Sequence, residues 1–172
     1  EDTGIKFQIE IHNAPVWVKV WYLNPETFKT CPMFFLSTDV PENDHISKTI
    51  CHKLYDANES TKLAQYILLG KGGAKLLDEM NLERDVYHLN EAHGLPAAFY
   101  LLRKYGGDLS KVKEKLVFTT HTPEEAGNEK HNLYHCHDMS YFSGLSIDEV
   151  KKIEGVDDDR FNHSLCALRM SR

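Results

Sequence analysis

Residues 86–93 read VYHLNEAH, and residues 117–123 read VFTTHTP. Each stretch begins with β-branched and aromatic residues, which favour strands, and then changes abruptly to polar residues. In a chain that alternates strands and helices, these polar residues lie just beyond the carboxyl ends of two strands. Open α/β sheets bind ligands at that edge. We therefore predict a site there, formed by Asn90, Glu91, His93, His121 and Thr122.

The bulk composition predicts one cytoplasmic α/β domain over residues 1–172. A chain of 172 residues with 41% hydrophobic residues is long enough to bury its own core. Its net charge of −6 argues against nucleic acid as a partner, because phosphate binding needs a basic face. No apolar run approaches the ~20 residues that cross a bilayer, so no membrane contact is expected. The four cysteines are scattered without a CxxC pair, which favours reduced thiols in a cytoplasmic protein.

The first 40 residues are typical of antiparallel strands. Residues 5–11 alternate apolar and polar side chains, the pattern of a half-buried strand. Residues 16–23 continue it after a predicted turn at residues 13–15, so the two strands should form an antiparallel hairpin. Residues 32–38 predict a third, more fully apolar strand. The aromatic residues here are interpreted as core or sheet-face residues, and an exposed platform for sugars is the alternative; they are Trp17, Trp21, Phe34 and Phe35.

Strand–helix alternation follows, and it indicates an α/β fold around a mainly parallel sheet. A helical stripe begins near Ser60, a candidate N-cap, and it runs through Leu63, Tyr66, Ile67, Gly70, Ala74 and Leu77. Further elements are predicted as strands at residues 85–89 and 115–120, and as helices at residues 94–104, at 146–154 and from 162 onward. Ser146 and Glu149 have capping-box spacing, and Gly106–Gly107 is a predicted helix stop.

Two local patterns have competing interpretations. The glycines of residues 70–73 could suggest a phosphate loop, but they lie inside the helical stripe, which favours close helix packing. His131, His135 and His137 could chelate a metal together with Cys136 or His163. The polar composition instead favours a solvated loop, and we predict residues 124–143 to be the most mobile part of the chain.

Several segments resemble the α-glucan (glycogen/maltodextrin/starch) phosphorylases, which are glycosyltransferases of the GT-B type. HLNEAH and FTTHTPEEAGNE are similar to the HLNEGH and FTTHTPVPAGHD of that family. FLSTDVPEN at residues 35–43 resembles its LLDTDVEEN, and LCALRMSR at residues 165–172 resembles its LALRLSR. KLAQYILLGKGG at residues 62–73 resembles its RIKQEILLGIGG. The resemblance implies a fragment of the N-terminal, Rossmann-like domain of a much longer enzyme.

The resemblance also implies a chemistry for the site. His121 would face the reacting sugar through its main-chain oxygen, with Thr122 beside it. Asn90, Glu91 and His93 would lie beside the glucosyl pocket. Taken without the resemblance, the same stretch would be interpreted as a polar helix N-cap followed by an acidic residue in the first turn. The family uses pyridoxal 5′-phosphate, whose lysine lies in a C-terminal half that this chain lacks. The expected partners are α-1,4-glucan, phosphate, that C-terminal domain and a second copy of the enzyme, and the isolated chain is expected to be inactive.

Departures from the family pattern keep other interpretations open. Lys62 replaces an arginine, Ala92 replaces a glycine, and Glu124–Glu125 replaces Val-Pro. One alternative is another GT-B glucosyltransferase, such as a glycogen or starch synthase. The other is a glucan-binding module without catalysis.

Overall fold

The chain opens with a hairpin, as predicted. The computed structural model describes residues 1–54, 56–124 and 128–172. Strands β1 (Asp2–Ile11) and β2 (Ala14–Leu23) pair antiparallel. The turn is formed by His12 and Asn13, at φ 51° and 58°, so the predicted turn at residues 13–15 was placed one residue too late. Two left-handed residues match the right-handed twist of the flanking strands.

The third strand completes a three-stranded antiparallel sheet in the order β1-β2-β3. A short helix α1 (Pro25–Phe28) precedes β3 (Met33–Ser37), which confirms the third strand. Its apolar composition does not mean burial, because β3 is an edge strand and Phe35 is 49% exposed. Phe35 lies opposite Trp21 across the strands, and both are exposed sheet-face residues.

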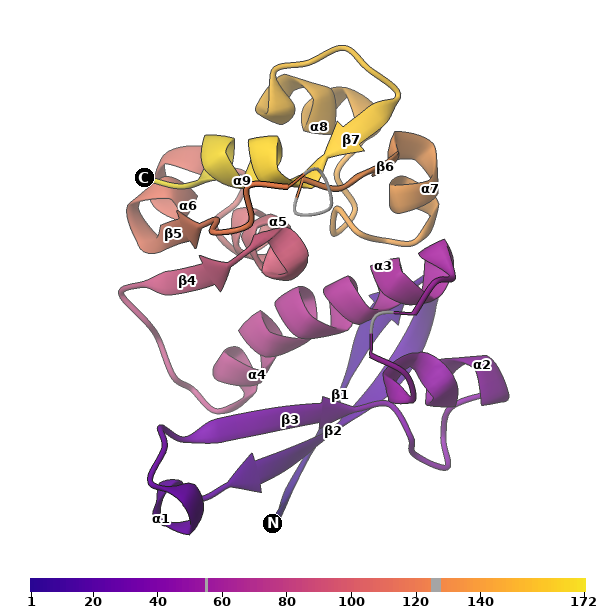
Figure 1. Cartoon of the computed structure of the whole chain (residues 1–172), viewed down its shortest axis with the longest axis vertical. Coiled ribbons are helices and arrows are strands. Elements are labelled where there is room, and N and C mark those ends of the chain that lie inside the picture. Colours follow the sequence, from indigo (N-terminus) through magenta and orange to yellow (C-terminus); the bar gives the residue numbers. More distant parts are fainter. Residues whose placement is uncertain (55, 125–127) are drawn as a thin grey trace.

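A long helical segment covers the inner face of this sheet (Figure 1). After α2 (His45–Lys48) and a 3₁₀ turn η1 (Thr49–Cys51), the segment is formed by α3 (Glu59–Ile67), a π-turn η2 (Leu68–Gly72) and α4 (Gly73–Glu79). Its N-cap is Asn58, whose side chain accepts from the Thr61 N–H, so the assignment of Ser60 was wrong. A Cβ on Gly70 would lie 2.5 Å from the Gly94 carbonyl oxygen. The glycine run therefore serves helix packing and is no phosphate loop.

The two signature stretches form a parallel pair of strands, β4 (Tyr87–Asn90) and β5 (Leu116–Thr119). The elements that connect them are a 3₁₀ turn η3 (Ala92–Gly94), α5 (Pro96–Lys104) and α6 (Leu109–Lys115). Helix α6 was not predicted, since Val112 is its only buried residue and gives no stripe. The stop after α5 is confirmed, because Gly106 and Gly107 both have positive φ.

The last third of the chain adds the elements β6 (Lys130–Asn132), α7 (Leu133–Asp138), α8 (Ile147–Glu154), β7 (Arg160–Asn162) and α9 (His163–Met170). The capping box of Ser146 and Glu149 is present at the start of α8. The interpretation of residues 124–143 as an unanchored loop is wrong from residue 130 onward. Buried apolar side chains anchor that tract, namely Leu133, Cys136, Met139, Tyr141 and Phe142. Residues 125–127 lie outside the described part of the chain.

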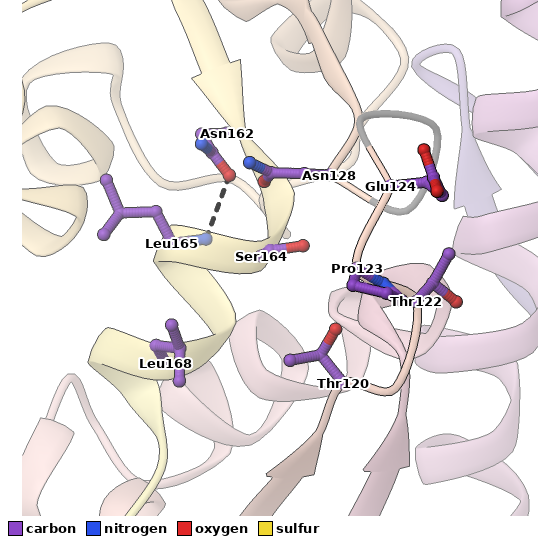
Figure 2. Close-up of a pocket in the computed structure, with 9 residues that line it drawn as sticks. All are labelled: Thr120, Thr122, Pro123, Glu124, Asn128, Asn162, Ser164, Leu165 and Leu168. Carbon is purple, nitrogen blue, oxygen red and sulfur yellow. Dashed lines mark hydrogen bonds between the residues drawn. The ribbon is translucent and has the colours of Figure 1, made fainter.

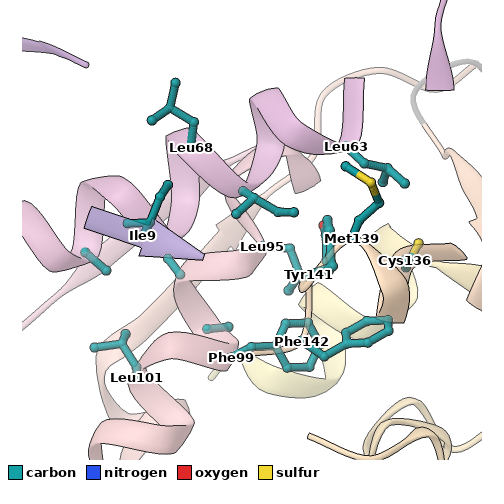
Figure 3. Close-up of a cluster of buried hydrophobic side chains, with 14 of the residues drawn as sticks. Ile9, Leu63, Leu68, Leu95, Phe99, Leu101, Cys136, Met139, Tyr141 and Phe142 are labelled. Carbon is teal, nitrogen blue, oxygen red and sulfur yellow. The ribbon is translucent and has the colours of Figure 1, made fainter. Parts of the chain in front are cut away.

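The mixed α/β class is confirmed, but the mainly parallel sheet is not. In the described residues, β4 and β5 form a parallel pair, β6 and β7 an antiparallel pair, and β1 to β3 an antiparallel sheet. The physical reason is the length of the connections, because a parallel pairing needs a crossover such as α5 and α6. One apolar cluster joins these pieces, and Figure 3 shows Ile9 of the sheet together with Leu63, Phe99 and Phe142. No helix within the described ranges is long and apolar enough to cross a membrane.

Candidate functional site

The polar ends of β4 and β5 meet because the two strands run parallel and in register. Asn90, the last residue of β4, lies opposite Thr119, the last residue of β5. The Glu91 N–H donates to the Thr119 carbonyl oxygen at 2.8 Å, which extends the pairing by one residue. The side chains that follow both strands are thereby held at one edge.

The Glu91 carboxylate lies at the centre of this edge. Its Oε1 accepts hydrogen bonds from the His121 backbone N–H at 2.9 Å and from the Thr122 hydroxyl at 3.0 Å. The residue is 7% exposed. The backbone hydrogen bond from His121 holds the pKa of Glu91 below its usual value, since it stabilises the ionised form. The carboxylate is therefore a buried anion near neutral pH.

Glu91 also has an unusual backbone. Its φ is 61° and its ψ is 174°. This region of conformational space is essentially reserved for glycine, because a Cβ crowds the backbone there. Strained residues of this kind gather at functional sites.

The imidazole of His121 is held in place and is still accessible. Its Nδ1 lies 3.4 Å from Glu91 Oε1, and its Nε2 lies 2.8 Å from Asn90 Oδ1. The side chain of His121 is nevertheless 62% exposed. The arrangement presents a fixed ring and a fixed backbone turn to a ligand at the sheet edge.

His93 does not join this group. It belongs to η3, and its ring lies 4.9 Å from the ring of Tyr66. Together with Ala92, Glu129 and His163, these two residues line a small internal cavity. The structure thus brings together Asn90, Glu91, His121 and Thr122, and it places His93 in a separate cluster.

That second cluster is centred on Glu129, which the sequence did not single out. Tyr66 donates to Glu129 Oε2 at 2.7 Å, and Lys62 Nζ lies 3.0 Å from Glu129 Oε1. Burial opposes the ionisation of Glu129, but the hydrogen bonds from Tyr66 and Lys62 outweigh it and hold its pKa below the ordinary value. The sequence signal for Glu129 is weak, because it lies in a polar tract without periodicity.

Histidines of the histidine-rich tract form hydrogen bonds with His163 and with a neighbouring hydroxyl group. The ring of His163 is fully buried and bridges two side chains, with Nε2 2.8 Å from His131 Nδ1 and Nδ1 2.8 Å from the Tyr141 hydroxyl. Burial lowers the pKa of His163 well below its usual value. His135 Nε2 lies 3.1 Å from the Ser60 hydroxyl. Among the described residues, no group of three or more histidine, cysteine or acidic side chains could hold a metal ion.

A pocket of about 580 Å³ opens beside the strand-end cluster, between the segment after β5 and helix α9 (Figure 2). The residues that line it are Thr120, Thr122, Pro123, Glu124, Asn128, Asn162, Ser164, Leu165 and Leu168. Hydroxyl and amide groups next to leucine side chains suit a polyhydroxylated ligand, which has both polar edges and apolar faces. A second pocket of about 750 Å³ lies between β3 and α3–α4, and its lining is mostly apolar.

Lys71 does not supply a pyridoxal phosphate site at the β4–β5 edge. A Schiff-base lysine needs a depressed pKa and access to the cofactor. Burial does lower the pKa of Lys71. However, Lys71 Nζ lies 3.3 Å from the Glu10 carbonyl oxygen in β1, on the sheet side of the helix rather than at the β4–β5 edge.

Comparison with known proteins identifies relatives of this chain. It is 32% identical to the maltodextrin phosphorylase of Thermococcus litoralis over 95% of the chain and 20% of that protein. It is 25% identical to the glycogen phosphorylase of Aquifex aeolicus over 100% of the chain and 26% of that protein. The chain is homologous to part of the α-glucan phosphorylases. This confirms the resemblance inferred from the HLNEAH and FTTHTP motifs.

The phosphorylase relatives are much longer than the chain. It spans about a fifth to a third of the relatives it matches. An uncharacterized protein of Methanocaldococcus jannaschii is 42% identical over 100% of the chain and 32% of its own length. No family model matches the chain, and no solved structure gives a significant match.

Proposed function

We propose that this chain forms part of the active site of an α-glucan phosphorylase. The whole protein would use inorganic phosphate to release α-D-glucose 1-phosphate from the ends of α-1,4-glucans. The observation that carries the proposal is the contact of Glu91 with His121 and Thr122, because it joins the two phosphorylase-like motifs in space. A chance likeness of two short motifs would not require them to meet.

The chemistry explains why such an edge is useful. Glucosyl transfer passes through an oxocarbenium-like state, in which positive charge develops on the sugar ring. Fixed acceptors that face this charge stabilise the transition state more than the neutral substrate. We propose that the main-chain oxygen of His121 is such an acceptor. The ring of His121, Asn90 and Thr122 would bind sugar hydroxyls, with Glu91 and His93 in the surrounding wall.

The remaining parts of the enzyme are proposed from its relatives. Residues 1–172 would form one Rossmann-like domain of a GT-B enzyme, and a C-terminal domain would face the β4–β5 edge. Pyridoxal 5′-phosphate would supply acid–base chemistry through its phosphate group, held by that second domain. The chain's own residues would orient the sugar and exclude water. We further propose a cytoplasmic homo-oligomer.

The test is an assay of the intact natural protein with maltodextrin, phosphate and added pyridoxal 5′-phosphate. Glucose 1-phosphate should form, and His121→Ala should lower kcat/KM by roughly a hundredfold, the usual effect of losing one preorganised contact. The matched control is His88→Ala, since His88 is a histidine near the same edge, on β4, whose ring bonds to Thr119 instead. Absence of glucose 1-phosphate would refute the proposal, and turnover of a nucleotide-activated glucose would assign the protein to another class of glucosyltransferase.

A further inference from the structure

We infer that Glu91 is a positioning residue, whose carboxylate holds the turn at residues 119–122 and does not bind the sugar. The consequence for turnover rests on the proposed function, whereas the structural role does not. In this respect Glu91 differs from Asn90 and His121, which present exposed polar groups at the same edge.

The contacts of Glu91 are directed inward, at one short segment. The backbone N–H of Glu91 binds the Thr119 carbonyl, and its carboxylate binds the backbone of His121 and the hydroxyl of Thr122. A single residue thus makes hydrogen bonds to three of the four residues from Thr119 to Thr122. Hydrogen bonds to an ionised acceptor are about twice as strong as neutral ones. The hydrogen bonds of the Glu91 carboxylate are therefore less easily replaced by water.

Accessibility argues against a direct contact between Glu91 and the ligand. Glu91 is 7% exposed and does not line the adjoining pocket, whereas Thr120 and Thr122 on either side of His121 do. Figure 2 shows these two threonines on the segment that follows β5, where they line the pocket. A ligand in the pocket would meet that turn and not the carboxylate beneath it.

The backbone of Glu91 points to the same role. At φ 61° and ψ 174°, glycine would be the residue without steric conflict. The glutamate that stands here carries its side chain in spite of this strain. Oε1 of Glu91 accepts both hydrogen bonds from His121 and Thr122, while the buried Oε2 has no hydrogen-bond partner among the described residues. The contacts that the side chain makes are thus to the segment after β5.

The first test measures the structural role by hydrogen–deuterium exchange of the His121 backbone amide in the intact protein. Glu91→Ala should speed this exchange by about tenfold or more, because a hydrogen bond to a charged group is lost. Glu91→Gln keeps an acceptor but loses the charge, so its effect should be intermediate. Asp85→Asn, an exposed carboxylate at the other end of β4, should leave the exchange rate unchanged. Unchanged exchange in both Glu91 variants would overturn the inference, whatever the activity of the protein.

The second test separates positioning from sugar binding. In the phosphorolysis assay, Glu91→Gln should lower kcat by about tenfold or more while KM for maltodextrin stays within about threefold, because the lost contact acts through His121. A rise in KM at unchanged kcat would make Glu91 a sugar ligand and refute the inference. If the wild-type protein forms no glucose 1-phosphate, the proposed function fails, and the exchange measurement alone decides the role of Glu91.

Discussion

Replacing Glu91 by alanine and by glycine separates the two opposing contributions of this residue to stability. Both variants lose the hydrogen bonds to His121 and Thr122. A hydrogen bond to a charged acceptor stabilises a fold by about 1.5–3 kcal/mol, so this loss destabilises both variants. The alanine variant keeps a Cβ at φ 61° and ψ 174°, a conformation that costs a non-glycine residue about 1–3 kcal/mol. The glycine variant is released from that strain. Glycine also loses about 0.5–1 kcal/mol more chain entropy on folding than alanine does.

The difference between the two variants therefore isolates the backbone strain. Subtracting the entropy cost from the strain leaves Glu91→Gly about 1 kcal/mol more stable than Glu91→Ala. The measurement is the free energy of unfolding in urea for both variants. Asp85 supplies the control, because it is exposed and does not have a positive φ. There the glycine variant should be the less stable one, as glycine usually is. A glycine variant at position 91 that is no more stable than the alanine variant would refute the strain argument.

Two further predictions concern packing and pH. Gly70→Ala should destabilise the fold by about 2–3 kcal/mol, because its Cβ would lie 2.5 Å from the Gly94 carbonyl oxygen; Gly73→Ala, which meets nothing within 4 Å, should instead stabilise the helix by up to about 1 kcal/mol. Equal free energies of unfolding for the two variants would contradict the close contact of Gly70 with Gly94. The lowered pKa of His163 means that the native state binds fewer protons than the unfolded chain below the ordinary histidine pKa of about 6.5. The contribution of neutral His163 to the free energy of unfolding should be fully present above that pH. Below it, the free energy of unfolding should fall by up to about 1.4 kcal/mol per pH unit. His163→Asn should flatten this slope between pH 6.5 and 5, and an unchanged slope would show that His163 is not its source.

The sequence predicted those features that depend on neighbouring residues. The alternation of β1 and β2, the capping box of Ser146 and Glu149 and the close approach at Gly70 all follow from local spacing, and the structure confirms them. The contact between residues 90–91 and residues 121–122 could also be predicted from the sequence, because parallel strands place their carboxyl ends at one edge of the sheet.

The failures concern long-range packing. Residues 130–143 look polar in the sequence, but Leu133 and Tyr141 fill the core and His131 finds its partner in His163, 32 residues away. No local pattern encodes that pairing. His93 was grouped with Glu91 because they are close in sequence, yet the 3₁₀ turn at Ala92–Gly94 directs it toward Tyr66.

The most direct test of the proposed active site is a crystal structure of the intact protein with a bound maltooligosaccharide. A glucosyl unit should lie at the β4–β5 edge, with its hydroxyls within hydrogen-bonding distance of the His121 ring and Thr122, and its ring facing the His121 main-chain oxygen. The Glu91 carboxylate should keep its bonds to the turn and make none to the sugar. A saccharide bound elsewhere, with this edge unchanged, would contradict the proposed glucan site.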